Sequence, residues 1–93
     1  MRTRARIRHK KQERIQRQAS ERIRETLNGD QRRILALSQA GYEIGEIARE
    51  LALTSEYVAH FTTGLIQRLT HDGLIASPEW RNVLEWAMEE GVI

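Results

Sequence analysis

The chain has no cysteine and no long apolar run, and each absence removes a class of protein. Without cysteine, the chain can form neither a disulfide nor a zinc site with cysteine ligands. No apolar run approaches the roughly 18 residues of a membrane-spanning helix. The basic N-terminus also lacks the apolar segment of a secretory signal, so we expect a soluble protein in the cytoplasm.

The chain also lacks the arrangements of side chains that catalysis or metal binding requires. His9, His60 and His71 do not have the spacing of metal ligands. Glu46 and Glu50 are about one helical turn apart, which is typical of charges on a helix surface. A chain of 93 residues is also short for a deep catalytic cleft with its own supporting shell. We therefore expect no enzyme activity, no metal and no cofactor.

What the chain does have is charge, unevenly distributed along the sequence. Residues 1–27 hold ten basic and three acidic residues, a net charge of +7, whereas residues 28–93 hold five basic and ten acidic residues, a net charge of −5. A segment as basic as the first attracts polyanions, of which nucleic acid is the usual example. We expect eight of its side chains to bind phosphates: Arg2, Arg4, Arg6, Arg8, Lys10, Lys11, Arg14 and Arg17.

The same N-terminal segment is predicted to be a helix. Between Thr3 and Leu27 there is no glycine or proline, and residues that favour helices dominate. A narrow seam of apolar residues runs along it, formed by Ile7, Ile15, Ala19, Ile23 and Leu27. Such a seam indicates packing against a partner helix or against the rest of the chain. We interpret residues 1–27 as a basic helical arm.

Residues 28–75 show the start and stop signals of three short helices, expected at about 29–40, 43–51 and 54–71. Asn28 is suited to cap the first helix with Gln31 as its capping-box partner, and Gly41 is suited to end it. Ala52 and Leu53 are expected to form the turn before the third helix, which Thr54 caps and Gly73 ends. By spacing, twelve residues should face inward: Ile34, Leu35, Leu37, Ile44, Ile47, Ala48, Leu51, Val58, Phe61, Leu65, Ile66 and Leu69.

Residues 76–93 are predicted to form a final helix that belongs to the core or to a dimer contact. Ser77 and Pro78 offer a cap and a proline for its first turn. Its apolar stripe comprises Trp80, Val83, Leu84, Ala87 and Met88. Trp86 lies partly off this stripe, which makes it a candidate for an exposed interface residue. The candidate dimer contacts are Ile15, Ile23, Trp80, Leu84 and Trp86. The whole chain is thus expected to be all-α, with about five helices.

A longer pattern covers residues 27–69 and is carried by scaffold positions: ILALSQAG at 34–41, Glu46-Ile47-Ala48, Leu51, Leu53, Val58, Leu65 and Leu69. With these residues, the stretch resembles the LuxR/GerE-type helix-turn-helix of bacterial transcription regulators, without a gap. Region four of sigma factors uses a similar scaffold. The resemblance implies a DNA-binding domain, commonly dimeric and in a bacterial or phage context, whose third helix enters the major groove.

The resemblance also implies which side chains meet DNA. The first turn of the third helix offers amides and hydroxyls to phosphate. Glu56 can accept a hydrogen bond from a cytosine amino group, and Thr63 can contact a thymine methyl group. The candidate DNA-binding residues are Thr54, Ser55, Glu56, Tyr57, Ala59, His60, Thr63 and Gln67.

The leading hypothesis is a homodimeric transcription regulator that reads double-stranded DNA with its third helix and gains affinity from the basic arm. Two alternatives stay open, because Glu56 and Ala59 occupy positions where the resembling family often has lysine. In the first, the acidic body is a protein-interaction module that contacts RNA polymerase or another regulator. In the second, the arm alone binds nucleic acid without sequence preference.

Overall fold

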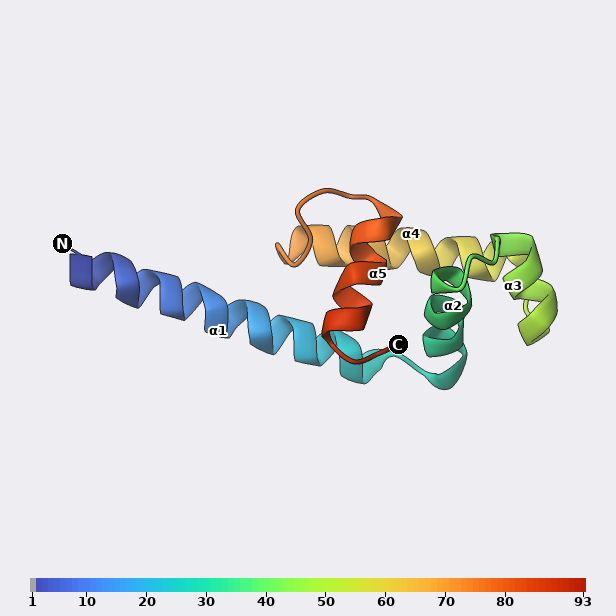
Figure 1. Cartoon of the computed structure of the whole chain (residues 1–93), viewed down its shortest axis with the longest axis horizontal. Helices are drawn as coiled ribbons and strands as arrows, with labels where there is room; N and C mark the ends of the chain where they lie inside the picture. The colour runs from blue at the N-terminus through green and yellow to red at the C-terminus, as the bar shows by residue number, and fades with distance from the viewer. Residues whose placement is uncertain (1) are drawn as a thin grey trace.

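The computed structural model describes the backbone of residues 2–93 and the side chains of residues 14–93. The described chain is all-helical, as predicted, and its five helices are α1 (Arg2–Thr26), α2 (Gly29–Gln39), α3 (Ile44–Leu51), α4 (Ser55–His71) and α5 (Trp80–Glu89). Helices α2 to α5 lie together beyond the C-terminal half of α1, with α3 at the end of the molecule farthest from the N-terminus, and the N-terminal half of α1 extends away from them (Figure 1). The molecule is therefore elongated, with extents of 55 × 21 × 19 Å. None of the described helices combines the length and apolar character that crossing a membrane requires.

Local sequence signals set most of the helix ends. The Asn28 Oδ1 accepts a hydrogen bond from the Gln31 backbone N–H at 2.8 Å, and the Gln31 Oε1 accepts one from the Asn28 N–H at 3.0 Å, so the predicted capping box is confirmed. The Thr54 Oγ1 accepts from the Tyr57 N–H at 3.0 Å and caps α4 as predicted. Gly41 has a φ of 99°, which ends α2 in the left-handed region.

The turn between α3 and α4 is tight and partly strained. Ala52 has a φ of 55°, the only positive φ of a residue other than glycine in the described backbone. The Leu53 N–H donates to the Ala48 carbonyl at 2.8 Å, which closes the end of α3. The predicted turn at Ala52 and Leu53 is confirmed. It fixes the direction in which α4 leaves α3.

The predicted start of the final helix is wrong by a few residues. Helix α5 begins at Trp80, and Glu79 occupies the cap position. Ser77 instead holds the preceding loop, because the Asn82 Nδ2 donates to the Ser77 Oγ at 2.8 Å and to its carbonyl at 3.2 Å. Two residues expected to face inward are exposed, namely Ile44 at 42% and Met88 at 46%.

Two apolar clusters hold the fold together. The first joins α1 and α5 to α2 and α4, and the second lies where α3 turns into α4. We call them the α1–α5 core and the turn core. The α1–α5 core comprises Ile23, Leu27, Leu35, Leu65, Leu69, Val83, Trp86 and Ala87. The turn core comprises Ile34, Ile47, Ala48 and Val58. Burial of these side chains supplies the main stabilising free energy.

Polar contacts fix the C-terminal half of α1 on the body. The Ser20 hydroxyl accepts from the Trp86 Nε1 at 2.7 Å and donates to the Glu90 Oε1 at 2.5 Å. The Arg24 Nη1 donates to the Glu90 carbonyl at 3.3 Å and lies 3.8 Å from its carboxylate. Arg32 caps the C-terminal end of α1, because its guanidinium donates to the Arg24 and Leu27 carbonyls. The arm and the body are thus joined mainly through the part of α1 that follows residue 19.

Candidate nucleic-acid interface

Helix α4 presents a polar stripe on the side opposite its buried residues. The exposed stripe of α4, as we call it, consists of Glu56, His60, Thr63 and Gln67. These positions recur three or four residues apart, so they share one face of the helix. The opposite face is buried and contains Val58, Leu65 and Leu69. Ala59, at the edge of the stripe, is half-buried.

The N-terminal turn of α4 is exposed as well. Thr54, Ser55 and Glu56 are all solvent-exposed, and Tyr57 is 39% exposed. The Thr54 Oγ1 already accepts the cap hydrogen bond, so the hydroxyl keeps its proton for an external acceptor. The first amides of a helix point outward along its axis and suit an anion. This end of α4 can therefore contact a phosphate while the stripe contacts bases.

The exposed stripe of α4 carries almost no positive charge. Glu56 is its one formally charged residue at neutral pH. The nearest cation on the same helix is Arg68, whose Nη1 donates to the Thr26 Oγ1 at 3.4 Å. Arg49, in the last turn of α3, is also exposed. The stripe can thus form hydrogen bonds to base edges, but it offers little general attraction to DNA.

The positive charge lies on α1, which is fixed next to the end of α4. The Gln16 Nε2 donates to the Gly73 carbonyl at 3.3 Å, just beyond the C-terminus of α4. Arg14 and Arg17, among the predicted phosphate-binding residues, are exposed. The side chains of the other six lie outside the described residues: Arg2, Arg4, Arg6, Arg8, Lys10 and Lys11. The structure therefore places the basic arm beyond one end of α4.

The residues predicted to contact a second copy are not all accessible. Trp86 is only 4% exposed and Ile23 only 1%, because α1 and α5 pack on each other within one chain. The interpretation of Trp86 as an exposed residue is therefore wrong, and Ile23, a candidate dimer contact, is buried within the single chain. Trp80 and Leu84 are half-buried against the same core. Ile15 is the exposed member of the set, at 63%.

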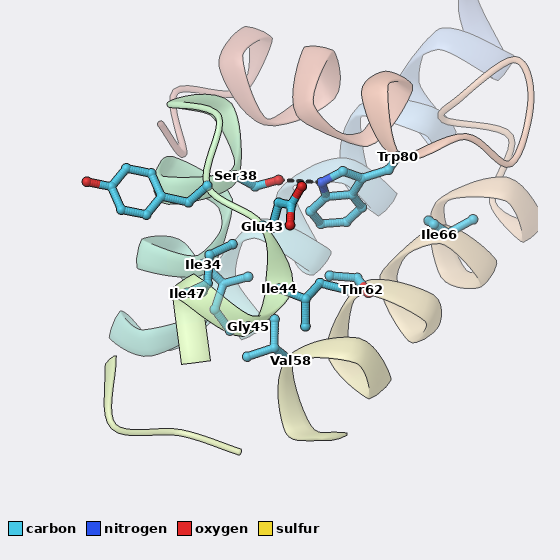
Figure 2. Close-up of a pocket in the computed structure, with 11 residues that line it drawn as sticks. Ile34, Ser38, Glu43, Ile44, Gly45, Ile47, Val58, Thr62, Ile66 and Trp80 are labelled. Atoms are coloured by element: carbon cyan, nitrogen blue, oxygen red, sulfur yellow. Dashed lines mark hydrogen bonds between the residues drawn. The ribbon is translucent and has the colours of Figure 1, made fainter. Parts of the chain in front are cut away.

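A groove of about 580 Å³ lies on one side of α4, where α2, α3 and α5 approach it. Figure 2 shows its apolar walls, to which Ile34, Ile44 and Ile66 contribute, and the hydrogen bond that crosses it. In that bond, the Trp80 Nε1 donates to the Ser38 Oγ at 2.6 Å. Glu43 adds a carboxylate to the lining. The groove can accommodate an apolar side chain that is accompanied by a positive charge.

A second, smaller hollow of about 340 Å³ lies on the other side of α4. It is bounded by the end of α1, the start of α2, and His60, Gly64 and Arg68 of α4. No carboxylate belongs to its described lining. The two hollows therefore differ in chemistry, since the larger one is apolar and acidic and the smaller one can carry positive charge.

The described side chains offer no arrangement for a metal, because no three histidine, aspartate or glutamate residues among them gather closely enough.

Comparison with known proteins found no matching family model, no matching curated protein and no matching solved structure.

Sequence reasoning missed the polar junction between α1 and α5. Ser20 is 3% exposed and is the one polar residue buried to this degree among residues 14–93. A serine within the apolar seam of residues 15–27 was a usable signal, because a buried hydroxyl needs a partner. The identity of that partner was not accessible, since Glu90 lies 70 positions away in sequence.

Proposed function

We propose that this chain is a DNA-binding transcription regulator that places α4 in the major groove and binds phosphates with the basic side chains of α1. The observation that carries the proposal is the exposed stripe of α4, which projects from a tight α3–α4 turn with a buried apolar face behind it. This is the geometry of a helix-turn-helix, in which the second helix contacts base edges. The resemblance of residues 27–69 to the LuxR/GerE-type domain supports the same function.

The dimensions and chemistry of α4 suit base readout. A helix with its side chains is about 10–12 Å across, and the major groove is about 12 Å wide. Gln67 can form paired hydrogen bonds to adenine, and Glu56 can accept from cytosine. Thr63, between them on the stripe, can contact a thymine methyl group. The stripe therefore offers several different base contacts along one line.

The arm supplies the attraction to DNA that the body lacks. Residues 28–93 carry a net charge of −5, which opposes the approach of phosphates, whereas residues 1–27 carry +7. Each phosphate contact contributes a slope of about −0.9 in log affinity against log salt. We propose that the arm makes most of the phosphate contacts and so accounts for most of the salt dependence of binding, and that α4 supplies the sequence preference.

We also propose that the regulator acts as a homodimer in the cytoplasm of a bacterium or in a phage context. Two copies of α4 would read half-sites about 34 Å apart on one face of the duplex. The exposed Ile15 supports this part of the proposal, because a large apolar residue left accessible in the apolar seam of α1 suits a contact with a second helix.

Selection from a random pool of duplexes tests the proposal. The full chain is incubated with the pool, bound duplexes are recovered and sequenced, and binding is followed by fluorescence anisotropy across salt. We expect enrichment of a sequence motif. Binding without enrichment would favour non-specific binding through the arm, and no binding at all would contradict both nucleic-acid functions.

A second candidate function is supported by the apolar groove. In this alternative, the groove binds a basic protein segment that carries an apolar side chain, as on RNA polymerase or another regulator. Tyr42 and Ile44 are each 42% exposed at its edge, and Glu43 provides the negative charge. Titration with an amphipathic lysine–leucine peptide tests it. Ile44→Ala should weaken peptide binding, whereas Ala59→Lys should strengthen DNA binding and leave peptide binding unchanged or weaker.

A further inference from the structure

The structure contains a glycine that the fold itself does not require. Gly64 is the tenth residue of α4 and lies in the interior of this helix. Glycine is less favourable than alanine at such a position, because it loses more backbone entropy on folding. Its backbone is not in the left-handed region, and a Cβ built on it would meet no atom within 4 Å apart from its chain neighbours and the adjacent backbone of its own helix. Nothing within the described chain therefore explains why a side chain is absent.

Four other glycines also have open space around them, but Gly41 and Gly91 have a positive φ, which a residue with a side chain rarely adopts. The remaining two differ from Gly64 in their position in the helix. Gly29 is the first residue of α2, and Gly45 is the second residue of α3. At the start of a helix, glycine costs less, because the first amides have no intrahelical partner in any case. Gly64, by contrast, lies in the interior of a helix. The absence of its side chain indicates that a binding partner outside the chain comes close to the backbone of α4.

The surroundings of Gly64 favour an anion. Gly64 forms part of the smaller hollow of about 340 Å³, between His60 and Arg68 on α4 and the junction of α1 and α2. The Arg68 guanidinium is held at its edge by the hydrogen bond to Thr26. No carboxylate is part of the described lining. The hollow therefore combines a guanidinium and an imidazole, both of which can donate to a phosphate, with a stretch of helix backbone that no side chain covers.

The position of the hollow relative to the exposed stripe of α4 indicates which phosphate can reach it, namely one of the DNA backbone. Gly64 follows Thr63, so it lies about 100° further round the helix than this stripe residue. Tyr57 and Arg68 lie seven before and four after Gly64, on the same flank. When a helix lies in a groove about 12 Å wide, its flanks face the two sugar–phosphate walls. The flank that contains Gly64 then faces one strand of the DNA backbone.

We infer that the missing side chain at Gly64 lets one DNA strand approach α4, so that a backbone phosphate lies between His60 and Arg68. This inference deepens the proposed function and rests on it. The Gly64 site would fix the depth and rotation of α4 in the major groove, because a phosphate contact sets register without reading sequence. Gly64 is in this sense a positioning residue for the stripe.

Substitution of Gly64 by alanine separates binding from folding. In Gly64→Ala, the melting temperature should rise by about 4 °C, because alanine favours the helix and the new methyl group meets open space. Affinity for a random duplex should nevertheless fall about tenfold, because the methyl group keeps the strand from the Arg68 guanidinium. Gly45→Ala is the matched control, and it should bind DNA as tightly as the unaltered chain.

A double-mutant cycle identifies the phosphate contact. Arg68→Ala alone should make the salt slope shallower by about 0.9, the value for one phosphate. In the Arg68→Ala background, Gly64→Ala should cost less than about threefold in affinity, since the two changes then remove the same contact. A full tenfold cost in that background would contradict the inference.

The outcomes distinguish this inference from the function on which it rests. If the unaltered chain does not bind duplex DNA, the proposed function fails. If it binds and Gly64→Ala binds equally tightly, or no worse than Gly45→Ala, the Gly64 site is overturned while the DNA-binding function stands. The site is supported if Gly64→Ala is at least as stable as the unaltered chain and binds DNA more weakly, while Gly45→Ala binds as tightly as the unaltered chain.

Discussion

Helices α1 and α4 are the two longest of the five helices, and they differ in charge and in the side chains that they expose. Residues 1–27, which include α1, carry a net charge of +7. Helix α4 carries the polar stripe of Glu56, His60, Thr63 and Gln67, with little positive charge. In the proposed function, attraction to DNA and sequence readout therefore lie on separate helices. The junction that joins these two helices is then as important for function as either surface.

The largest effect is expected where α1 joins the body. Trp86→Ala removes a nearly fully buried indole from the α1–α5 core and also the donor to Ser20. We expect a loss of about 3–5 kcal/mol in the free energy of unfolding, measured by urea denaturation and circular dichroism. Met88→Ala on the same helix is the control, because Met88 is 46% exposed, and it should change stability by less than about 0.5 kcal/mol. Equal effects of the two substitutions would contradict the described packing.

The next effect concerns the arm. Replacing Arg2, Arg4, Arg6 and Arg8 together by glutamine should make the salt slope of DNA binding shallower by up to about 3.6, at about 0.9 for each phosphate that the arm no longer neutralises. Affinity should fall by about a hundredfold or more, and nearly uniformly across sequences, because phosphate contacts carry no sequence information. Anisotropy titrations across salt measure both quantities. A weakening confined to particular sequences would show that the arm reads bases.

A smaller and different effect is expected on the stripe. Thr63→Ala should leave the salt slope unchanged and lower the preference for the selected duplex over random DNA by about tenfold, the usual size of one base contact. Competition titrations of the two duplexes measure this ratio. Thr70→Ala is a suitable control, because Thr70 is exposed near the C-terminal end of the same helix. A change of the salt slope without a change of the preference for the selected duplex would show that Thr63 contacts phosphates and not bases.

The smallest effect is expected at the cap of α4. Thr54→Ala removes the oxygen that accepts from the Tyr57 N–H and should cost about 1 kcal/mol of stability. Thermal denaturation measures this cost, and Ser55→Ala, one residue further on and exposed, should cost less. If the two cost the same, Thr54 does not act as the cap.

The parts of the fold that sequence reasoning predicted are those with local causes. Asn28 with Gln31, Gly41 and Thr54 each set a helix end through contacts within a few residues, and the structure confirms all of them. The apolar spacing also predicted the burial of Ile34, Val58 and Leu69, because a helical period places them on inner faces. Such signals need no knowledge of the partner element.

The parts that sequence reasoning missed depend on elements far apart in the chain. The burial of Trp86 follows from the docking of α1 on α5, and the period of α5 alone placed this residue at the edge of its stripe. The start of α5 was missed because the side chain of Ser77, in the preceding loop, accepts a hydrogen bond from the Asn82 side chain in the first turn of α5. The hollow at Gly64 is formed by α4 and the α1–α2 junction together, so neither segment alone predicts it.

The most direct test of the division between α1 and α4 is to repeat the selection from random duplexes with the variant in which Arg2, Arg4, Arg6 and Arg8 are glutamine. We expect the unaltered chain and this variant to enrich the same motif, and the variant to bind it more weakly and with a shallower salt slope. Disappearance of the motif together with the four arginines would contradict this division, because readout would then belong to α1 and not to α4.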